Sequence, residues 1–239
     1  MPLYCTVRRR DLISLAIAMS DCCGSLWDAF GRPATLAFVG GGGQTTLGFH
    51  VLKNGAAAGY RALFTTTTRI RLPRVPEQVD VLVEDSELRE AIASLRRAFE
   101  GHQRVALVTS REMSAHGVRG VGVPTEWIEI LMKQEQIADL CVIEADGSRM
   151  LPFKAPRVPM EPVLPKYIGA VVAVAGLDAL GVPLDEDHVC RADVVAKLTH
   201  LQQGDPVTAL TIGKVLGDRD LWCHALESPV PFHVVVNKA

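Results

Sequence analysis

The stretch FVGGGGQTTLGF, residues 38–49, decides the fold of this chain. It closes an apolar run, passes through four glycines and continues into two threonines that open a predicted helix. Successive glycines adopt positive φ without steric cost, so their N–H groups can converge on one anion. The positive end of the following helix dipole strengthens that attraction. The stretch therefore predicts a strand, a phosphate-binding loop and a helix in that order.

The rest of the chain alternates apolar strands with helices. Strands are predicted at residues 35–40, 62–68, 104–110, 139–148, 169–176 and 233–239. Helices are predicted at residues 46–58, 86–101, 125–136, 190–201 and 206–216, the last of them capped by Asp205. This alternation is typical of an α/β fold with a mostly parallel sheet flanked by helices. A three-layer sandwich like that of P-loop NTPases is the predicted fold class.

Length, charge and cysteine usage narrow the class of protein. The 239 residues predict a lead-in helix at 1–33 and a P-loop-like nucleotide-binding domain at 34–239. A net charge of −2 argues against partners such as nucleic acid or a membrane surface. No apolar run reaches the ~20 residues that span a bilayer. Six cysteines without a C-x-x-C pair favour a reduced, cytoplasmic location.

The glycine stretch matches a Walker A loop, G-x-x-x-x-G-K-S/T, only in part. Aligning Thr45 with the hydroxyl position puts Gln44 on the lysine, and the first glycine falls on Phe38. A Rossmann G-x-G-x-x-G fingerprint fails as well, because its third glycine would be a threonine. The predicted nucleotide-binding residues of the loop are Gly40, Gly41, Gly42, Gly43, Gln44, Thr45 and Thr46. A tight strand-to-helix turn without a ligand is the alternative.

The segment VIEADG, residues 142–147, has the form of a Walker B strand. Glu144 and Asp146 are two residues apart, so on a continuing strand they share a face, where one can hold Mg²⁺ and the other orient a water. Thr45 and Asp146 are the predicted metal ligands. A solvated turn is the alternative, since D-G is a common turn pair. With Gln44 uncharged, Arg69 and Lys154 are the nearest candidates to balance phosphate charge.

Taken together, several stretches resemble one family, the YqeC-like selenium-dependent hydroxylase accessory proteins. They are VGGGGQTTL, FTTTTRI, VIEADGSRMLPFKAP, EPVLP, VAGLDALGVPL with Arg191 after it, and the terminal VVNKA. The resemblance runs from about residue 34 to the end. It implies a P-loop fold and a role in maturing selenium-dependent molybdenum hydroxylases by inserting or preparing their metal cofactor. It also implies a polar rim at residues 65–68, including Thr67 and Thr68, and makes Lys154 the lysine of the KAP segment.

Two departures from the family pattern bear on activity. The resemblance implies lysine where this chain has Gln44, so NTP hydrolysis is expected to be weak or absent. It also implies a terminal N-K-x-D-like stretch that reads the base. Asn237 and Lys238 are present, but the sequence stops at Ala239 before an aspartate. The choice between ATP and GTP therefore stays open, and a fragment truncated at its C-terminus is expected.

Three functions follow from these residues, and the sequence leaves all three open. The first is a nucleotide-binding accessory protein, in which Mg²⁺ with ATP or GTP switches contact with a molybdenum hydroxylase or cofactor-loading protein. The second is a non-catalytic module that holds a nucleotide or a phosphorylated cofactor such as molybdopterin. The third is a nucleotidyl- or phosphotransferase acting on a molybdopterin-type cofactor, with Asp146, Glu144 and Lys154 as its catalytic residues.

Overall fold

The computed structural model describes residues 24–115 and 117–238, and its centre is a sheet of seven strands. In chain order the strands are β1 (Thr35–Gly40), β2 (Ala62–Thr66), β4 (Val81–Glu84), β5 (Arg104–Val108), β8 (Leu140–Glu144), β10 (Ala170–Gly176) and β12 (Phe232–Asn237). Across the sheet they lie in the order β12-β10-β1-β8-β2-β5-β4, and every neighbouring pair is parallel. The predicted α/β fold with a mostly parallel sheet is confirmed.

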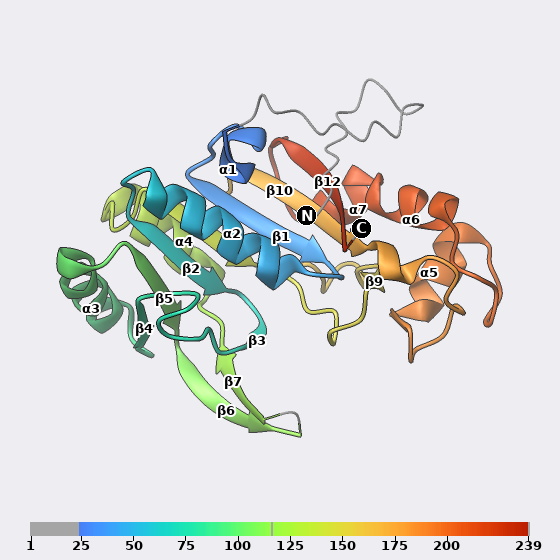
Figure 1. The fold of residues 1–239 in the computed structure, drawn as a ribbon, viewed down its shortest axis with the longest axis horizontal. Helices are drawn as coiled ribbons and strands as arrows, with labels where there is room; N and C mark the ends of the chain where they lie inside the picture. The colour runs from blue at the N-terminus through green and yellow to red at the C-terminus, as the bar shows by residue number, and fades with distance from the viewer. Residues whose placement is uncertain (1–23, 116, 239) are drawn as a thin grey trace.

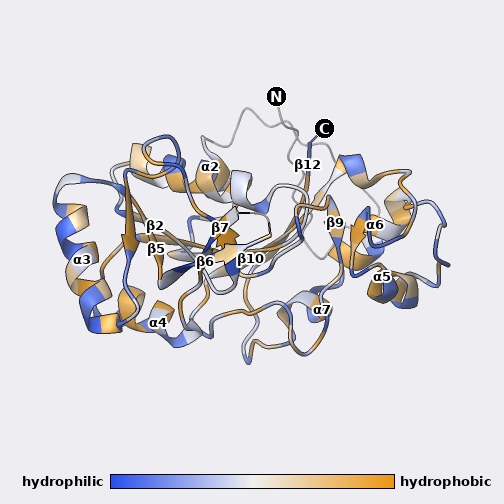
Figure 2. Cartoon of the chain, turned by 90° about the horizontal axis from the view of Figure 1, so that it is seen from below, coloured by the Kyte–Doolittle hydropathy of each residue, from blue (hydrophilic) through white to orange (hydrophobic). Residues whose placement is uncertain are grey.

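Helices cover both faces of this sheet and complete three layers (Figures 1 and 2). One face carries α1 (Leu26–Ala29) and α2 (Gln44–Ala57). The other packs against α3 (Leu88–Gly101), α4 (Thr125–Glu129) with its π-helical continuation (Ile130–Gln134), α5 (Ala192–Thr199), α6 (Ala209–Leu216) and α7 (Arg219–Cys223). A short 3₁₀ helix (Leu177–Ala179) follows β10. Neighbouring residues of β1 enter opposite cores, Phe38 on the α2 side and Val39 on the other.

The apolar runs of the sequence are explained by burial on both faces of the sheet. Every residue of β1 and every residue of β10 is buried. Central strands of a parallel sheet are covered by helices on both sides, so they read as continuous apolar runs rather than as alternating patterns. Composition and order along the chain were therefore enough to locate these strands.

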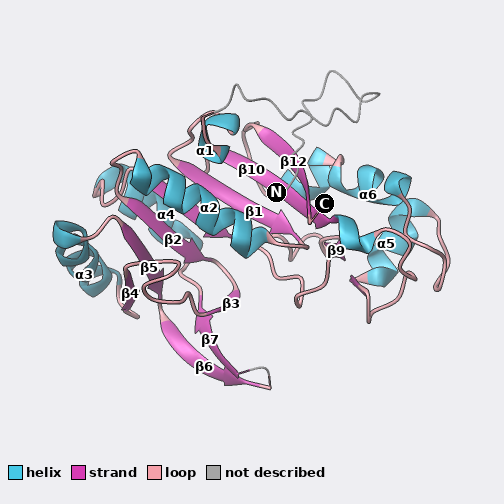
Figure 3. Ribbon diagram, viewed as in Figure 1, coloured by secondary structure: helices cyan, strands magenta, loops and turns pink. Residues whose placement is uncertain are grey.

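A three-stranded antiparallel sheet projects from the β2 and β5 end of the molecule (Figure 3). It consists of β3 (Arg69–Arg71), β6 (Ser110–Ser114) and β7 (Gly117–Val121), and we call it the arm. The strands predicted at 62–68 and 104–110 are shorter than expected because the arm takes over the pairing. The Gly122 N–H donates to the Thr68 carbonyl, and the Thr109 N–H donates to the Val121 carbonyl.

A two-residue parallel pairing joins β9 (Phe153–Lys154) to β11 (Val189–Cys190). It brings the lysine of the KAP segment beside the residues that lead into α5.

The predicted Asp205 cap of the last long helix is wrong. Thr208 caps α6 instead, because its hydroxyl accepts the Thr211 N–H while the Thr211 side chain accepts the Thr208 N–H. Asp205 accepts the Gln202 N–H at 2.8 Å.

The predicted lead-in helix at 1–33 falls mostly outside the described residues, which begin at 24. Within them, α1 packs on α2, and the Leu26 N–H donates to the Asn54 Oδ1 at 3.1 Å. Among the described residues, none of the helices combines the length and the hydropathy needed to span a membrane.

Candidate functional site

The glycine loop, residues 40–43, lies at the carboxyl end of β1. This strand pairs with β10 on one side and with β8 on the other, so the loop sits between the ends of two further parallel strands. Ligands of open α/β sheets bind at this edge. Gly40, Gly42 and Gly43 have φ of 97°, 68° and 120°, and α2 begins at Gln44. The predicted order of strand, glycine turn and helix is confirmed.

Three of the loop amides already have acceptors inside the protein. The Gly40 N–H donates to Asp146 Oδ2 at 3.2 Å, the Gly41 N–H to the Val174 carbonyl at 2.8 Å and the Gly42 N–H to the Leu151 carbonyl at 3.1 Å. The first bond of α2 runs from the Leu47 N–H to the Gly43 carbonyl at 3.0 Å. The amides of residues 43–46 precede that bond and have no intrahelical acceptor. An anion at this loop would therefore meet the first turn of α2 rather than the first three glycine amides.

Close packing accounts for the glycines themselves. A Cβ on Gly40 would lie 2.3 Å from the Val174 carbonyl oxygen, and one on Gly42 would lie 2.0 Å from the Gly176 nitrogen. A Cβ on Gly43 would lie 2.1 Å from the Asn237 Nδ2. A turn without a ligand would demand glycine at these positions as well. The case for a ligand must therefore come from the side chains around the loop.

The strongest such contact joins the start of α2 to the end of β8. The Thr45 hydroxyl donates to Glu144 Oε2 at 2.6 Å. A hydroxyl beside a carboxylate is a pair of hard oxygen ligands of the kind that Mg²⁺ prefers, with waters and phosphate oxygens completing the octahedron. The described residues hold no group of three or more His, Cys, Asp or Glu that could bind a metal alone. The donor set thus fits a magnesium ion that arrives with a phosphorylated ligand.

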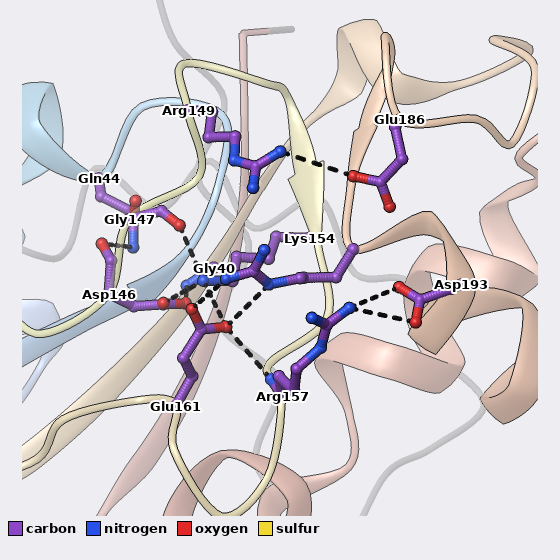
Figure 4. Close-up of polar contacts among 11 residues, drawn as sticks. Gly40, Gln44, Asp146, Gly147, Arg149, Lys154, Arg157, Glu161, Glu186 and Asp193 are labelled. Carbon is purple, nitrogen blue, oxygen red and sulfur yellow. Dashed lines mark hydrogen bonds and ion pairs between the residues drawn. The ribbon is translucent and has the colours of Figure 1, made fainter.

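Asp146 belongs to a different arrangement, a buried ion-pair cluster (Figure 4). Its carboxylate pairs with the Lys154 ammonium, and the two side chains are 1% and 0% exposed. Lys154 also donates to the Gly147 carbonyl at 2.7 Å and pairs with Glu161 at 3.0 Å. Glu161 in turn pairs with Arg191 at 2.8 Å. Both carboxylate oxygens of Asp146 are engaged within the protein, whereas the Glu144 carboxylate contacts the Thr45 hydroxyl. The geometry therefore favours Glu144 as the carboxylate that would share a metal ion with Thr45. A metal role for Asp146 stays a prediction.

Burial and hydrogen bonding together set the pKa values of these carboxyl groups. Burial raises the pKa of Glu144 to about 7, although the hydrogen bond from Thr45 opposes the change. It also raises the pKa of Asp146 to about 6, with the charge of Lys154 opposing. Burial acts in the same direction on Glu161, but hydrogen bonds from Arg191 and Lys154 outweigh it and lower the pKa to about 2.

Gln44, on the position of the Walker A lysine, lies inside the site. Its side chain is buried, and its Nε2 donates to the Asp146 carbonyl oxygen at 3.4 Å (Figure 4). The amide thus supports the acidic turn but carries no charge. Within the described cluster, Lys154 is the cation in direct contact with Asp146.

The profile of the YqeC protein family matches residues 36–193, which hold the glycine loop, Glu144 and the Lys154 cluster. The chain belongs to the YqeC family. An Escherichia coli (strain K12) relative, "Uncharacterized protein YqeC", is 32% identical over 170 residues, which cover 71% of this chain and 62% of the relative. The chain thus spans less than two thirds of that relative's length. No solved structure matches.

Most of the threonine hydroxyls of residues 65–68 in this YqeC-family chain donate hydrogen bonds to backbone carbonyls of the protein. The hydroxyls of Thr65, Thr66 and Thr67 donate to the carbonyls of Leu107, Glu144 and Val163 at 2.9, 2.7 and 2.6 Å. The Thr68 hydroxyl lies 3.3 Å from that of Thr66. These contacts hold the ends of neighbouring strands together. Ligand contacts of Thr67 and Thr68 stay a prediction.

The structure places the three other predicted nucleotide-binding residues in different surroundings. Arg69 pairs with Glu112 of the arm at 2.7 Å, and Lys238 pairs with Asp178 at 2.7 Å. Asn237 is buried and reaches the glycine loop, where its Nδ2 donates to the Gly42 carbonyl at 3.0 Å. Of the terminal Asn-Lys pair, only the asparagine is in contact with the loop in the structure.

The structure adds residues to which sequence reasoning assigned no role. Glu161 and Arg191 extend the Lys154 cluster, and Arg119 of the arm acts electrostatically on Glu144. Glu161 lies in the EPVLP segment, so family resemblance was its only signal. Arg119 carried none, because the hairpin that positions it was not predicted.

Protonation of Glu144 predicts a pH-dependent stability for this YqeC-family protein. The folded state holds the proton to a pKa of about 7, against 4.5 ordinarily, so the stabilisation is complete at low pH and is lost as pH rises through about 7. Between about pH 5.5 and about pH 8, the unchanged chain should lose about 2 kcal/mol of unfolding free energy because Glu144 ionises. The Glu144→Gln variant should lack this loss when urea unfolding is measured at both pH values. The exposed control Glu100→Gln should leave the pH dependence intact. Equal pH profiles for both variants would contradict the assignment.

Proposed function

We propose that this chain binds Mg²⁺-nucleotide at the glycine loop and serves as an accessory protein in the maturation of selenium-dependent molybdenum hydroxylases, with weak or absent hydrolysis. The observation that carries the binding proposal is the 2.6 Å contact between the Thr45 hydroxyl and Glu144 Oε2. It joins the helix that follows the glycine loop to the acidic end of β8. The role in maturation rests on the family resemblance described above.

Each part of the site has a task in this proposal. Thr45 and Glu144 would hold Mg²⁺, and the first-turn amides of α2 would hold phosphate oxygens. The bound ion would supply charge neutralisation for the phosphates. Gln44 adds a neutral amide where a lysine would add a charge that matters most in the transition state. Binding should therefore persist while turnover is slow.

Calorimetric titration with ATP and GTP, with and without Mg²⁺, tests the binding. Thr45→Val removes the hydroxyl beside Glu144 at nearly constant volume and should weaken Mg²⁺-nucleotide binding about tenfold, while Thr45→Ser should bind like the unchanged chain. Valine removes the hydroxyl and keeps the β-branched shape, whereas serine keeps the hydroxyl and removes only the methyl group. Equal affinities for valine and serine at this position would overturn the metal assignment.

Gln44→Lys tests the explanation for slow turnover. Restoring a cation at this position should raise the rate of NTP hydrolysis about 100-fold, because one well-placed donor contributes about 3 kcal/mol to the transition state. Released phosphate is measured with ATP and with GTP, alongside Gln44→Met as a neutral control of similar length. Intact binding without any gain in the lysine variant would count against the Walker A alignment.

A non-catalytic phosphate-binding module is the second candidate. The engagement of three glycine amides with acceptors of the protein favours it, since it leaves fewer donors for a reacting phosphoryl group. Adding molybdopterin separates the candidates. A phosphate-binding module binds molybdopterin without turnover and without a nucleotide. A nucleotide-binding accessory protein instead binds Mg²⁺-nucleotide. A nucleotidyl- or phosphotransferase, using Asp146, Glu144 and Lys154, would release pyrophosphate or label the cofactor.

A further inference from the structure

The two faces of the arm differ in character. One face packs inward, because Ile70 is 3% exposed and a Cβ on its register partner Gly120 would lie 2.7 Å from Val108 Cγ1. Residues directly opposite each other in an antiparallel pair share a face, so Arg71 and Arg119 lie together on the other face. The arm thus presents arginines on its outer face.

Neither of these two arginines forms an ion pair within the described residues, although Glu112 lies opposite Arg119 in register. The neighbouring Arg69 pairs with Glu112, whose register partner is Arg119. Across residues 24–115 and 117–238, neither Arg71 nor Arg119 has a hydrogen-bonded or ion-paired carboxylate. Like charges directly opposite in an antiparallel pair destabilise it. A bound anion would remove that repulsion.

The arm is anchored next to Glu144. The Thr66 hydroxyl donates to the Glu144 carbonyl at 2.7 Å, and the Val123 N–H, just beyond β7, donates to the Thr66 carbonyl at 2.8 Å. The charge of Arg119 also acts on the Glu144 carboxylate, where it opposes the effect of burial on the pKa. The base of the arm, where β7 ends, therefore lies next to Glu144.

We propose that Arg71 and Arg119 form a second anion site, which binds a phosphoryl group of a polyphosphate or phosphate ester beside Glu144. The guanidinium fork matches phosphate oxygens in geometry and charge, so two arginines on adjacent strands suit this class of ligand. The place of this phosphoryl group in a reaction rests on the proposed function, whereas anion binding by the pair does not. The phosphoryl group belongs either to the nucleotide or to a second phosphorylated ligand.

Titration of the full chain with inorganic tripolyphosphate tests the pair. Arg71→Gln and Arg119→Gln should each weaken binding about tenfold, as expected for the loss of a charge-assisted hydrogen bond. Arg111→Gln is the matched control, because Arg111 lies on the opposite face and pairs with Glu84 at 2.7 Å. Circular dichroism checks that all three variants fold. Tripolyphosphate affinities of the Arg71 and Arg119 variants equal to that of the unchanged chain would overturn the proposal.

Parallel titrations with Mg²⁺-ATP separate this proposal from the proposed function. If Thr45→Val weakens Mg²⁺-ATP binding as expected while the arginine variants retain tripolyphosphate affinity, only the arginine site is overturned. If the arginine variants lose tripolyphosphate and no Mg²⁺-nucleotide binds, only the nucleotide function is overturned. If neither probe binds the unchanged chain, both proposals are overturned.

Comparing the affinities for ATP and ADP identifies the source of the phosphoryl group. Arg119→Gln removes a preference for ATP over ADP if the phosphoryl group belongs to the nucleotide. It leaves that preference unchanged if a second ligand supplies the group.

Discussion

Replacing Lys154 with methionine should lower the free energy of unfolding by about 4 kcal/mol, because removing one partner of a buried pair leaves an uncompensated charge. The Lys154 side chain is 0% exposed and contacts Asp146, the Gly147 carbonyl and Glu161. Asp146, itself 1% exposed, would lose its cation and could escape the penalty only by taking up a proton. Urea denaturation at neutral pH measures the change.

Two controls identify burial as the cause. Lys166 pairs with Glu227 at 2.9 Å, but both side chains are about 80% exposed, so Lys166→Met should leave the free energy of unfolding nearly unchanged. The double variant Lys154→Met with Asp146→Asn should recover about half of the loss, because no unpaired carboxylate is left at Asp146. Equal effects at Lys154 and Lys166 would show that the cluster does not contribute to stability as described.

Gly42→Ala should destabilise the chain by about 4 kcal/mol, from the sum of left-handed backbone strain and overpacking. Gly42 has φ of 68°, and its Cβ would lie 2.0 Å from the Gly176 nitrogen and 2.6 Å from the Pro152 carbonyl oxygen. These neighbours are backbone atoms of β10 and of the segment before β9, so they cannot rotate away. The measurement is denaturant unfolding without nucleotide, which separates packing from ligand binding.

Gly59→Ala is the matched control for backbone strain alone. Gly59 has φ of 87°, and nothing lies within 4 Å of the position of its Cβ. The cost there should be about 1 kcal/mol, the strain of a left-handed residue without a clash. If both alanine variants lost the same stability, the close approach of the glycine loop to β10 would not be the reason for its glycines.

The strands at the centre of the sheet were predictable because both of their faces are buried. β1 and β10 read as apolar runs, and the order of strands and helices along the chain indicated the parallel topology. The arm was not predictable in the same way. Its strand β6 is exposed along most of its length, so no apolar run marks it. The cap of α6 was misassigned, because Asp205 and Thr208 are both common capping residues and only backbone geometry separates them.

The sequence by itself determined the glycine loop, the acidic strand end and the lysine of the KAP segment as the chemically informative residues, and it indicated the family. Only the tertiary structure decided how they pair. Thr45 contacts Glu144, Asp146 pairs with Lys154, and the charge of Arg119 in the arm acts on Glu144. Spacing reveals which side chains share a strand end. It cannot reveal which carboxylate a buried cation will neutralise, because that choice depends on burial and on contacts between distant segments.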